Sequence, residues 1–348
     1  MEGKRIARLC LAAALMGAIG AVAVTQVIAK PKPEDAAPPA PPPPPPMPDV
    51  ALGGAFIRDA AAFESYMRNA EQISPGFTDG GSVAQSLRTG VAYEPAQFQR
   101  GEVAFAAVAA LQDQAFVQAV RAAGQTPDSR YQIVARIFAD PSSVLAFDGG
   151  RAAAGLAKAA LADDGGRLLL TGKAIRQSAY DVQRQAWSKE DVAQRDDRLA
   201  AVKGLSTTPR DVPSDDVALL RAKVNGPQLA GPDPVPDPPP YSPLVIRATA
   251  LAALAAIGQA GDDAVDRLSW MSQDYFTQHC LTHAKNELNE CLAVARPNYE
   301  DVFCLGQPSL IYTAECVVKG AGATVPLEIA VNKIPIPPLA GGAHHRKR

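Results

Sequence analysis

Apolar side chains recur every three or four positions along most of this 348-residue chain, and few runs alternate with a period of two. The first spacing gathers apolar side chains on one face of an α-helix, whereas strict alternation is typical of a half-buried strand. Gly, Pro and Asp stand at the joints between the periodic segments, where helices start and stop. The pattern predicts an all-α protein whose first helices cover residues 56–73, 102–123, 131–139, 142–161 and 168–202.

A second set of helical segments follows a proline-rich break. Residues 244–261 form an apolar run that ends at Gly261 and contains Arg247. A membrane span needs about 20 apolar residues, so we expect this run to be a buried core helix. Residues 267–295 then read as one long helix with a single stripe of apolar and cysteine side chains: Phe276, Cys280, Ala284, Leu288, Cys291 and Ala295.

Prolines divide the chain into parts. Of 31 prolines, 11 fall in residues 31–48, 8 in residues 227–243 and 3 in residues 335–338. Because proline breaks helix interiors, these stretches predict spacers between helical units. The first reads either as an extended polyproline spacer or as a disordered leader without a mechanical role. We therefore expect six parts: a targeting segment (1–29), a proline-rich spacer (30–49), a helical domain (50–226), a linker (227–243), a helical domain with four cysteines (244–332) and a proline-rich basic tail (333–348).

The N-terminus carries a targeting pattern. Lys4, Arg5 and Arg8 precede residues 9–29, which contain no charge. A helix of that length is about 32 Å long and covers a bilayer core of about 30 Å. Small residues just before position 30 favour a cleaved signal peptide, whereas the length of the apolar run favours a retained anchor, and both readings stay open. Either one delivers the rest of the chain to the outside of the cytoplasm, in the periplasm or secreted.

Four cysteines lie outside the targeting segment, and an even number in an exported chain suggests disulfides. Cys280 and Cys291 share one predicted helix and are about 16 Å apart, whereas bridged Cα atoms lie within about 7 Å. Cys280 with Cys316, and Cys291 with Cys304, are both centred within half a residue of Asn298, which follows a proline and suits a helix start. An antiparallel helix pair hinged there predicts this nested pairing, whereas the remaining pairing requires crossed geometry.

Two helices clamped by nested disulfides resemble the coiled-coil-helix-coiled-coil-helix proteins with twin cysteine pairs. The resemblance covers only about 40 residues. The intervals of 10 and 11 residues between cysteines, and Pro308 in the second arm, depart from that family's pattern. The resemblance therefore implies the geometry of a hairpin and no shared function.

The amino-acid composition indicates how the core is packed and which classes of partner the charge allows. Hydrophobic residues make up 47% of the chain but aromatic residues only 6%, so alanine-rich helices that approach closely are expected to form the core. Without residues 1–29 the chain has 31 basic and 35 acidic residues, a net charge of −4. A weakly acidic body without a basic stripe argues against nucleic acid as the main partner. Arg346, Lys347 and Arg348 end the tail, either as a contact for an anionic surface or as a solubilising end.

Two histidines are the candidate metal ligands. His279 and His283 are four residues apart and share a helix face, as metal-binding imidazoles do. The predicted disulfide takes Cys280 away from such a site, so ordinary surface histidines are the expected reading. Phosphate-loop and dinucleotide glycine patterns are absent from the sequence, and no cofactor is predicted.

The candidate catalytic residue is Glu64. The pair of Glu64 and Ser65 resembles the Glu-Ser pair of lytic transglycosylases, which cleave peptidoglycan. The resemblance implies that Glu64 acts as general acid and base. That family's Gly-Leu-Met-Gln motif does not follow here. Gly80, Gly81 and Ser82 imitate part of a nucleophile elbow, but Ala84 stands where a second glycine is needed, so a loop and a helix start are expected.

The sequence thus favours an exported, non-enzymatic protein of the cell envelope that serves as an interaction or structural component with a protein partner. It is either released by cleavage or anchored through residues 9–29. The alternatives are a peptidoglycan-active hydrolase that uses Glu64 and a metal-binding module at His279 and His283.

Overall fold

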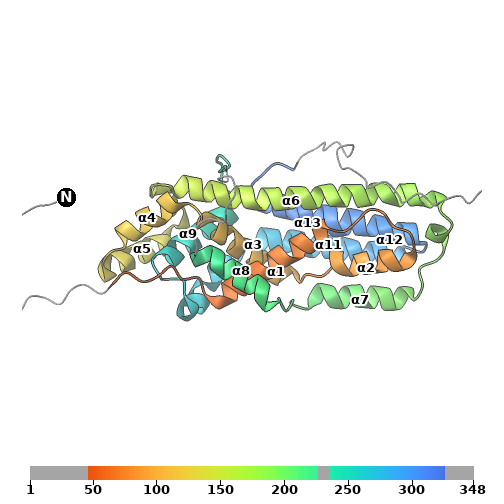
Figure 1. The fold of residues 1–348 in the computed structure, drawn as a ribbon, viewed down its shortest axis with the longest axis horizontal. Helices are drawn as coiled ribbons and strands as arrows, with labels where there is room; N and C mark the ends of the chain where they lie inside the picture. Colours follow the sequence, from red (N-terminus) through yellow and green to blue (C-terminus); the bar gives the residue numbers. More distant parts are fainter. Residues whose placement is uncertain (1–45, 226–234, 326–348) are drawn as a thin grey trace, which may run out of the picture. The chain divides into compact units, whose positions relative to one another are not determined.

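A computed structural model describes residues 46–225 and 235–325, and these residues are helical and contain no strand, which confirms the all-α class. The targeting segment 1–29, the tail 333–348, most of the spacer 30–49 and part of the linker 227–243 lie outside the described residues. Figure 1 shows the arrangement of the α-helices, which are α1 (Gly54–Glu71), α2 (Gly80–Gly90), α3 (Pro95–Ala110), α4 (Gln114–Ala123), α5 (Pro127–Ala139), α6 (Gly150–Asp181), α7 (Arg195–Thr207), α8 (Ser214–Asn225), α9 (Pro243–Ala256), α10 (Val265–Leu268), α11 (Tyr275–Val294), α12 (Asn298–Cys304) and α13 (Tyr312–Gly320).

Side-chain caps explain where several helices begin. Asp79 accepts a hydrogen bond from the backbone N–H of Ser82 at 2.8 Å, and α2 starts directly after it. Asp113 and Ser242 cap α4 and α9 in the same way. Each cap satisfies one of the backbone N–H groups that the first helical turn leaves without a partner. The glycine pair after Asp79 is accordingly a loop and helix start.

Several helix boundaries differ from the sequence prediction. The segment 168–202 is not one helix, because α6 ends at Asp181 and α7 begins at Arg195. Residues 102–123, predicted as one helix, form parts of α3 and α4, which are bent by 88° at a break that Asp113 caps. In contrast, α6 runs without interruption through Asp163–Gly166, where a joint was predicted. A side chain at Gly165 would place its Cβ 2.7 Å from Val318 Cγ2, so this glycine permits the close contact of α6 with α13 and does not end the helix.

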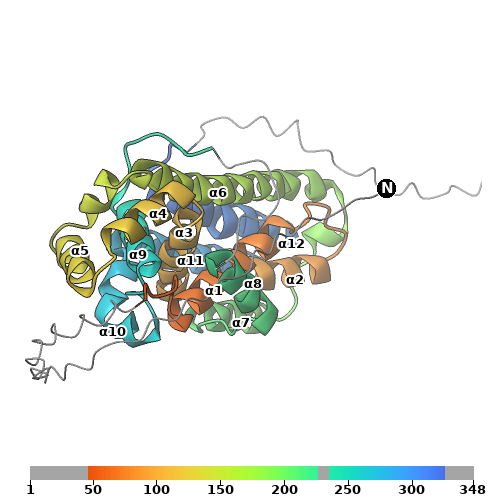
Figure 2. The same ribbon diagram turned by 60° about the vertical axis from the view of Figure 1, so that its left-hand side comes forward.

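The core is built by close helix approach, as the alanine content predicts. A Cβ at Gly101 of α3 would lie 2.2 Å from the backbone oxygen of Asp59 on α1, so only glycine fits at this crossing. The alanines of α9 are fully buried, which makes this helix the core helix expected for residues 244–261. Figures 1 and 2 both show α6 beside α13.

The described residues of the two expected helical domains, 50–226 and 244–332, lie in one compact unit and share one hydrophobic core. The described end of the linker joins them, because Lys158 of α6 donates to the carbonyl of Pro238 at 2.9 Å and the N–H of Asp237 donates to the carbonyl of Gly155 at 3.1 Å. A proline-rich segment is therefore packed along α6 by the carbonyl oxygen of Pro238, a group that proline retains, and by the N–H of Asp237.

Within residues 46–225 and 235–325, no single helix is both long and apolar enough to cross a bilayer. The bent pair α3 and α4 reaches the required length and apolarity together.

Candidate functional site

The C-terminal segments form a helical hairpin clamped by two disulfides. Cys280 pairs with Cys316 and Cys291 with Cys304, each with a Cα–Cα distance of 5.7 Å. This is the nested pairing that symmetry about Asn298 predicts. Helix α11 forms one arm, and the other arm consists of α12, the π-helical segment Leu305–Ile311 and α13.

Each arm differs in one detail from the sequence prediction. The first arm starts at Tyr275 and not near residue 267, because Asp274 caps it by accepting from the N–H of Thr277 at 2.9 Å. In the second arm, Pro308 lies inside the π-helical segment, whose wider turn accommodates a residue without an N–H group. This arm therefore stays helical throughout.

Two arginines of α7 hold the end of the first arm. The guanidinium of Arg198 pairs with Asp301 and also donates to the carbonyl of Leu292 at 2.6 Å. Arg195 donates to the carbonyl of Ala295 at 2.8 Å. Cations suit the last turn of a helix because its carbonyl groups lack partners there. Burial raises the pKa of Asp301, and Arg198 opposes that effect.

A surface hollow lies beside each disulfide. The first, of about 430 Å³, is lined by residues of α11 and α13: His279, Cys280, His283, Ala284, Glu287, Tyr312, Glu315, Cys316 and Lys319. The second, of about 410 Å³, has a mostly apolar lining: Ala179, Tyr180, Gln183, Cys291, Val294, Ala295, Tyr299, Glu300, Phe303 and Cys304. The two arms of the hairpin thus present two indentations of different chemistry.

The candidate metal ligands lie in the first hollow. His283 Nδ1 is 3.7 Å from Glu287 Oε1, one helical turn further along α11. In the part of the chain that the structure describes, no group of three or more His, Cys, Asp or Glu side chains is arranged to hold a metal ion. Cys280, the third candidate beside His279, is taken by its disulfide.

Glu64 lies on α1 in an ion pair. Both of its carboxylate oxygens accept from Arg68, at 2.8 and 2.6 Å, and Arg68 also contacts Asp216 of α8. A general acid must hold a proton and present it to the substrate. Arg68 occupies both carboxylate oxygens of Glu64, which leaves neither of them directed at a substrate, so the geometry does not favour the hydrolase reading.

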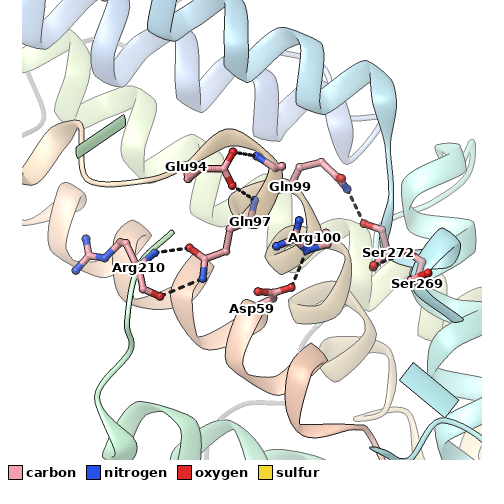
Figure 3. Close-up of polar contacts among 9 residues, drawn as sticks. Asp59, Glu94, Gln97, Gln99, Arg100, Arg210, Ser269 and Ser272 are labelled. Atoms are coloured by element: carbon pink, nitrogen blue, oxygen red, sulfur yellow. Dashed lines mark hydrogen bonds and ion pairs between the residues drawn. The ribbon is translucent and has the colours of Figure 1, made fainter. Parts of the chain in front are cut away.

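Figure 3 shows how polar side chains of α3 connect it to the helices around it. The Gln97 amide accepts from the N–H of Arg210 at 2.7 Å and donates to the carbonyl of the same residue at 3.1 Å. Gln99 donates to the carbonyl of Ser272, and Arg100 pairs with Asp59 of α1. These contacts position α3 against α1, the segment before α8 and the turn before α11.

A buried carboxyl group that was not predicted lies between α3 and α11. Glu102 is 0% exposed, and within the described residues neither of its carboxylate oxygens has a hydrogen-bond partner. A Cβ on Gly320 of α13 would lie 2.6 Å from Glu102 Oε1. Burial raises the pKa of Glu102 well above its ordinary value, and the carboxylate of Asp274 adds to the effect. Glu102 stands four residues from Phe98, on the same helix face, which is the signal that would have indicated burial.

A buried amine lies on the same arm of the hairpin. Lys285 of α11 is 5% exposed, and its ammonium donates to the carbonyl of Val91 at 2.6 Å and lies 3.4 Å from the centre of the Tyr93 ring. Burial lowers the pKa of Lys285 well below its ordinary value. Its spacing from Leu281 and Leu288 places it on the buried stripe of α11, so the sequence did contain this signal.

Lys285→Met is expected to raise the free energy of unfolding by about 1–2 kcal/mol at pH 7, because an apolar side chain needs no desolvation of charge. The carbonyl of Val91 keeps the N–H of Tyr93 as a partner. Folding lowers the pKa of Lys285 from its ordinary value of 10.5, so the unfolded chain binds this proton more tightly than the folded protein does. The free energy of unfolding of the wild-type protein therefore decreases as the pH falls below about 10.5. Urea unfolding at pH 6 and pH 9 should show the larger gain at pH 6.

Lys319→Met is the matched control, because this exposed lysine forms an ion pair with Glu315 on the same helix, and its loss should change stability by less than about 0.5 kcal/mol. A destabilised Lys285→Met protein would show that the buried ammonium contributes favourably to the core.

No family model, no curated protein and no solved structure matches the chain. The geometry of the described residues places the protein in the class of all-α proteins, with a disulfide-clamped helical hairpin packed into its core.

Proposed function

We propose that this protein acts outside the cytoplasm as a non-enzymatic component of the cell envelope, which uses its clamped hairpin to bind a protein partner. The observation that carries this proposal is the pair of nested disulfides, since disulfides form and persist in oxidising compartments and are rare in the cytosol. The sequence supports the proposal independently through the basic residues Lys4, Arg5 and Arg8 and the uncharged run 9–29 that follows them.

Exposed apolar side chains on the hairpin support a binding role. Tyr275 and Phe276 at the start of α11 are 76% and 65% exposed, and Val294 at its end is 76% exposed. The last of these lies at the apolar hollow beside Cys291. Aromatic and aliphatic side chains beside a hollow are typical of protein interfaces, where such residues become buried on binding. Two rigid arms hold these groups in fixed positions before any partner arrives, which lowers the entropy cost of binding.

The experiment is photo-cross-linking in intact cells, followed by mass spectrometry. A photoreactive phenylalanine analogue placed at Phe276 or Val294 is expected to capture a defined partner. The same analogue at Tyr131, an exposed aromatic residue on α5, is the matched control and should capture little. Equal capture from all three positions would contradict a binding role of the hairpin.

Alkylation of the protein from the same cells, with and without reductant, tests the compartment. No free thiol among the four hairpin cysteines is expected before reduction. Four alkylated hairpin cysteines in the unreduced sample would contradict export to an oxidising compartment, and the mass of the N-terminal peptide distinguishes a cleaved signal from a retained anchor.

A further inference from the structure

Six charged side chains from three helices, α1, α6 and α8, lie near the C-terminal half of α1. They form two groups, each with two carboxylates around one guanidinium, in the order Asp216, Arg68, Glu64, Glu71, Arg167 and Asp164. The first group connects α8 to α1, and the second connects α1 to the middle of α6. Each group carries one more negative than positive charge when all its carboxylates are ionised.

The second group is the more buried of the two at its carboxylates. Arg167 Nε contacts Glu71 Oε2 at 2.9 Å, and another nitrogen of the same guanidinium contacts Asp164. Asp164 is 8% exposed, and the side chain of Glu71 is 17% exposed. Among residues 46–225 and 235–325, Glu71 Oε1 has no hydrogen-bond partner although it is buried. One cation therefore serves two carboxylates, and one carboxylate oxygen has nothing to accept from.

The side chains around the second group add more negative than positive charge to it. Glu64 faces the group from α1, and Asp163 is an exposed neighbour on α6 that interacts with Arg167. The guanidinium of Arg68 pairs with Glu64 and Asp216. A net negative charge held out of water is unfavourable, and binding a proton is the simplest way to remove it.

We propose that Asp164, Arg167 and Glu71 form a proton-operated latch between α1 and α6. One proton from solvent binds a carboxylate oxygen of the group, the net charge of the group becomes zero, and the end of α1 packs more tightly on α6. Loss of the proton restores the repulsion between the two carboxylates and loosens this contact. Arg167 is 55% exposed, so the proton reaches the group without any opening of the fold.

The pKa directions agree with this arrangement. Burial raises the pKa of Asp164 from 3.8 to about 7, and the charges of Glu71 and Glu64 add to the effect while Arg167 opposes it. Burial also raises the pKa of Glu71. Between about pH 4 and pH 7 the folded protein thus keeps a proton on Asp164 that the unfolded chain releases. The contribution of this proton to the free energy of unfolding is largest below about pH 4 and is lost as the pH rises through about 7.

The test is urea unfolding of the full chain from pH 4.5 to pH 8.5, with Asp164→Asn as the variant. One proton released on unfolding makes the unfolding constant increase about tenfold per pH unit below pH 7, in addition to other groups. Asp164→Asn is expected to remove this tenfold dependence. Asp163→Asn removes the same charge from the exposed neighbouring position and should keep the wild-type profile.

Hydrogen exchange provides a second readout that needs no variant. After correction for the intrinsic effect of pH, amides at the end of α1 and near Asp164 in wild-type protein should exchange faster at pH 8 than at pH 6. Amides of α11 should show no such change. Equal pH profiles for wild type and Asp164→Asn, or equal flattening by Asp163→Asn, would overturn the latch, as would pH-independent corrected exchange at α1.

Discussion

Reduction of both disulfides is expected to lower the free energy of unfolding by about 6 kcal/mol. In the chain-entropy account, a bridge that closes 36 residues contributes about 4 kcal/mol and one that closes 13 residues about 3 kcal/mol. The two loops are nested, so the sum is smaller than these values added separately. A loss of this size is a large part of the 5–15 kcal/mol by which native proteins are stable.

The measurement is urea unfolding with and without reductant, together with two double variants. Cys280→Ala/Cys316→Ala removes the outer bridge and is expected to cost more than Cys291→Ala/Cys304→Ala, which removes the inner one. The reductant should have its smallest effect on a protein that lacks both bridges, which serves as the control. The same unfolding midpoint for oxidised and reduced wild-type protein would show that the packed core holds the hairpin without its bridges.

Arg198→Met is expected to lower the free energy of unfolding by about 3–5 kcal/mol. The side chains of Arg198 and Asp301 are 8% and 3% exposed, so the substitution leaves a buried carboxylate without its cation. The carbonyl of Leu292 loses its donor as well. This loss exceeds the net value of the ion pair, because it includes the cost of the unpaired charge that remains.

Two further variants separate these contributions in urea unfolding. Asp301→Asn in the Arg198→Met background removes the unpaired charge and should restore part of the stability. Arg195→Met is the matched control on the same helix, since Arg195 donates hydrogen bonds to the carbonyl groups of Ala293 and Ala295 and acts on Asp301 through its charge alone, and its loss should cost about 1–2 kcal/mol. An equal loss for Arg198→Met and Arg195→Met would show that the buried pair adds nothing beyond helix capping.

The hairpin was predictable because its signals are local. The cysteine spacing, the symmetry about Asn298 and the helix stop before it lie within 37 consecutive residues. The start of α11 was not predictable in the same way, although Asp274 is a good cap, because apolar side chains also recur upstream of it, at Val265, Leu268 and Met271. Helix type is visible in periodicity, whereas a boundary depends on one or two capping residues that compete with the same pattern.

The buried ionisable groups required the tertiary structure. Glu102 and Lys285 lie on apolar stripes of their helices, so their sequence positions contained a hint of burial. Nothing local indicated that Asp164 would meet Glu71, which is 93 residues earlier in the chain. The glycine beside Asp164 even suggested a helix break, whereas its actual use is contact with α13.

The sequence by itself determined the helical class, the alanine-based packing and the pairing of the hairpin cysteines, because short-range periodicity and spacing specify them. Only the tertiary structure decided that residues 50–226 and 244–332 share one core and that charged side chains of α1, α6, α7 and α8 meet. Burial and charge pairing depend on which distant helices approach one another, and that is a property of the packed chain.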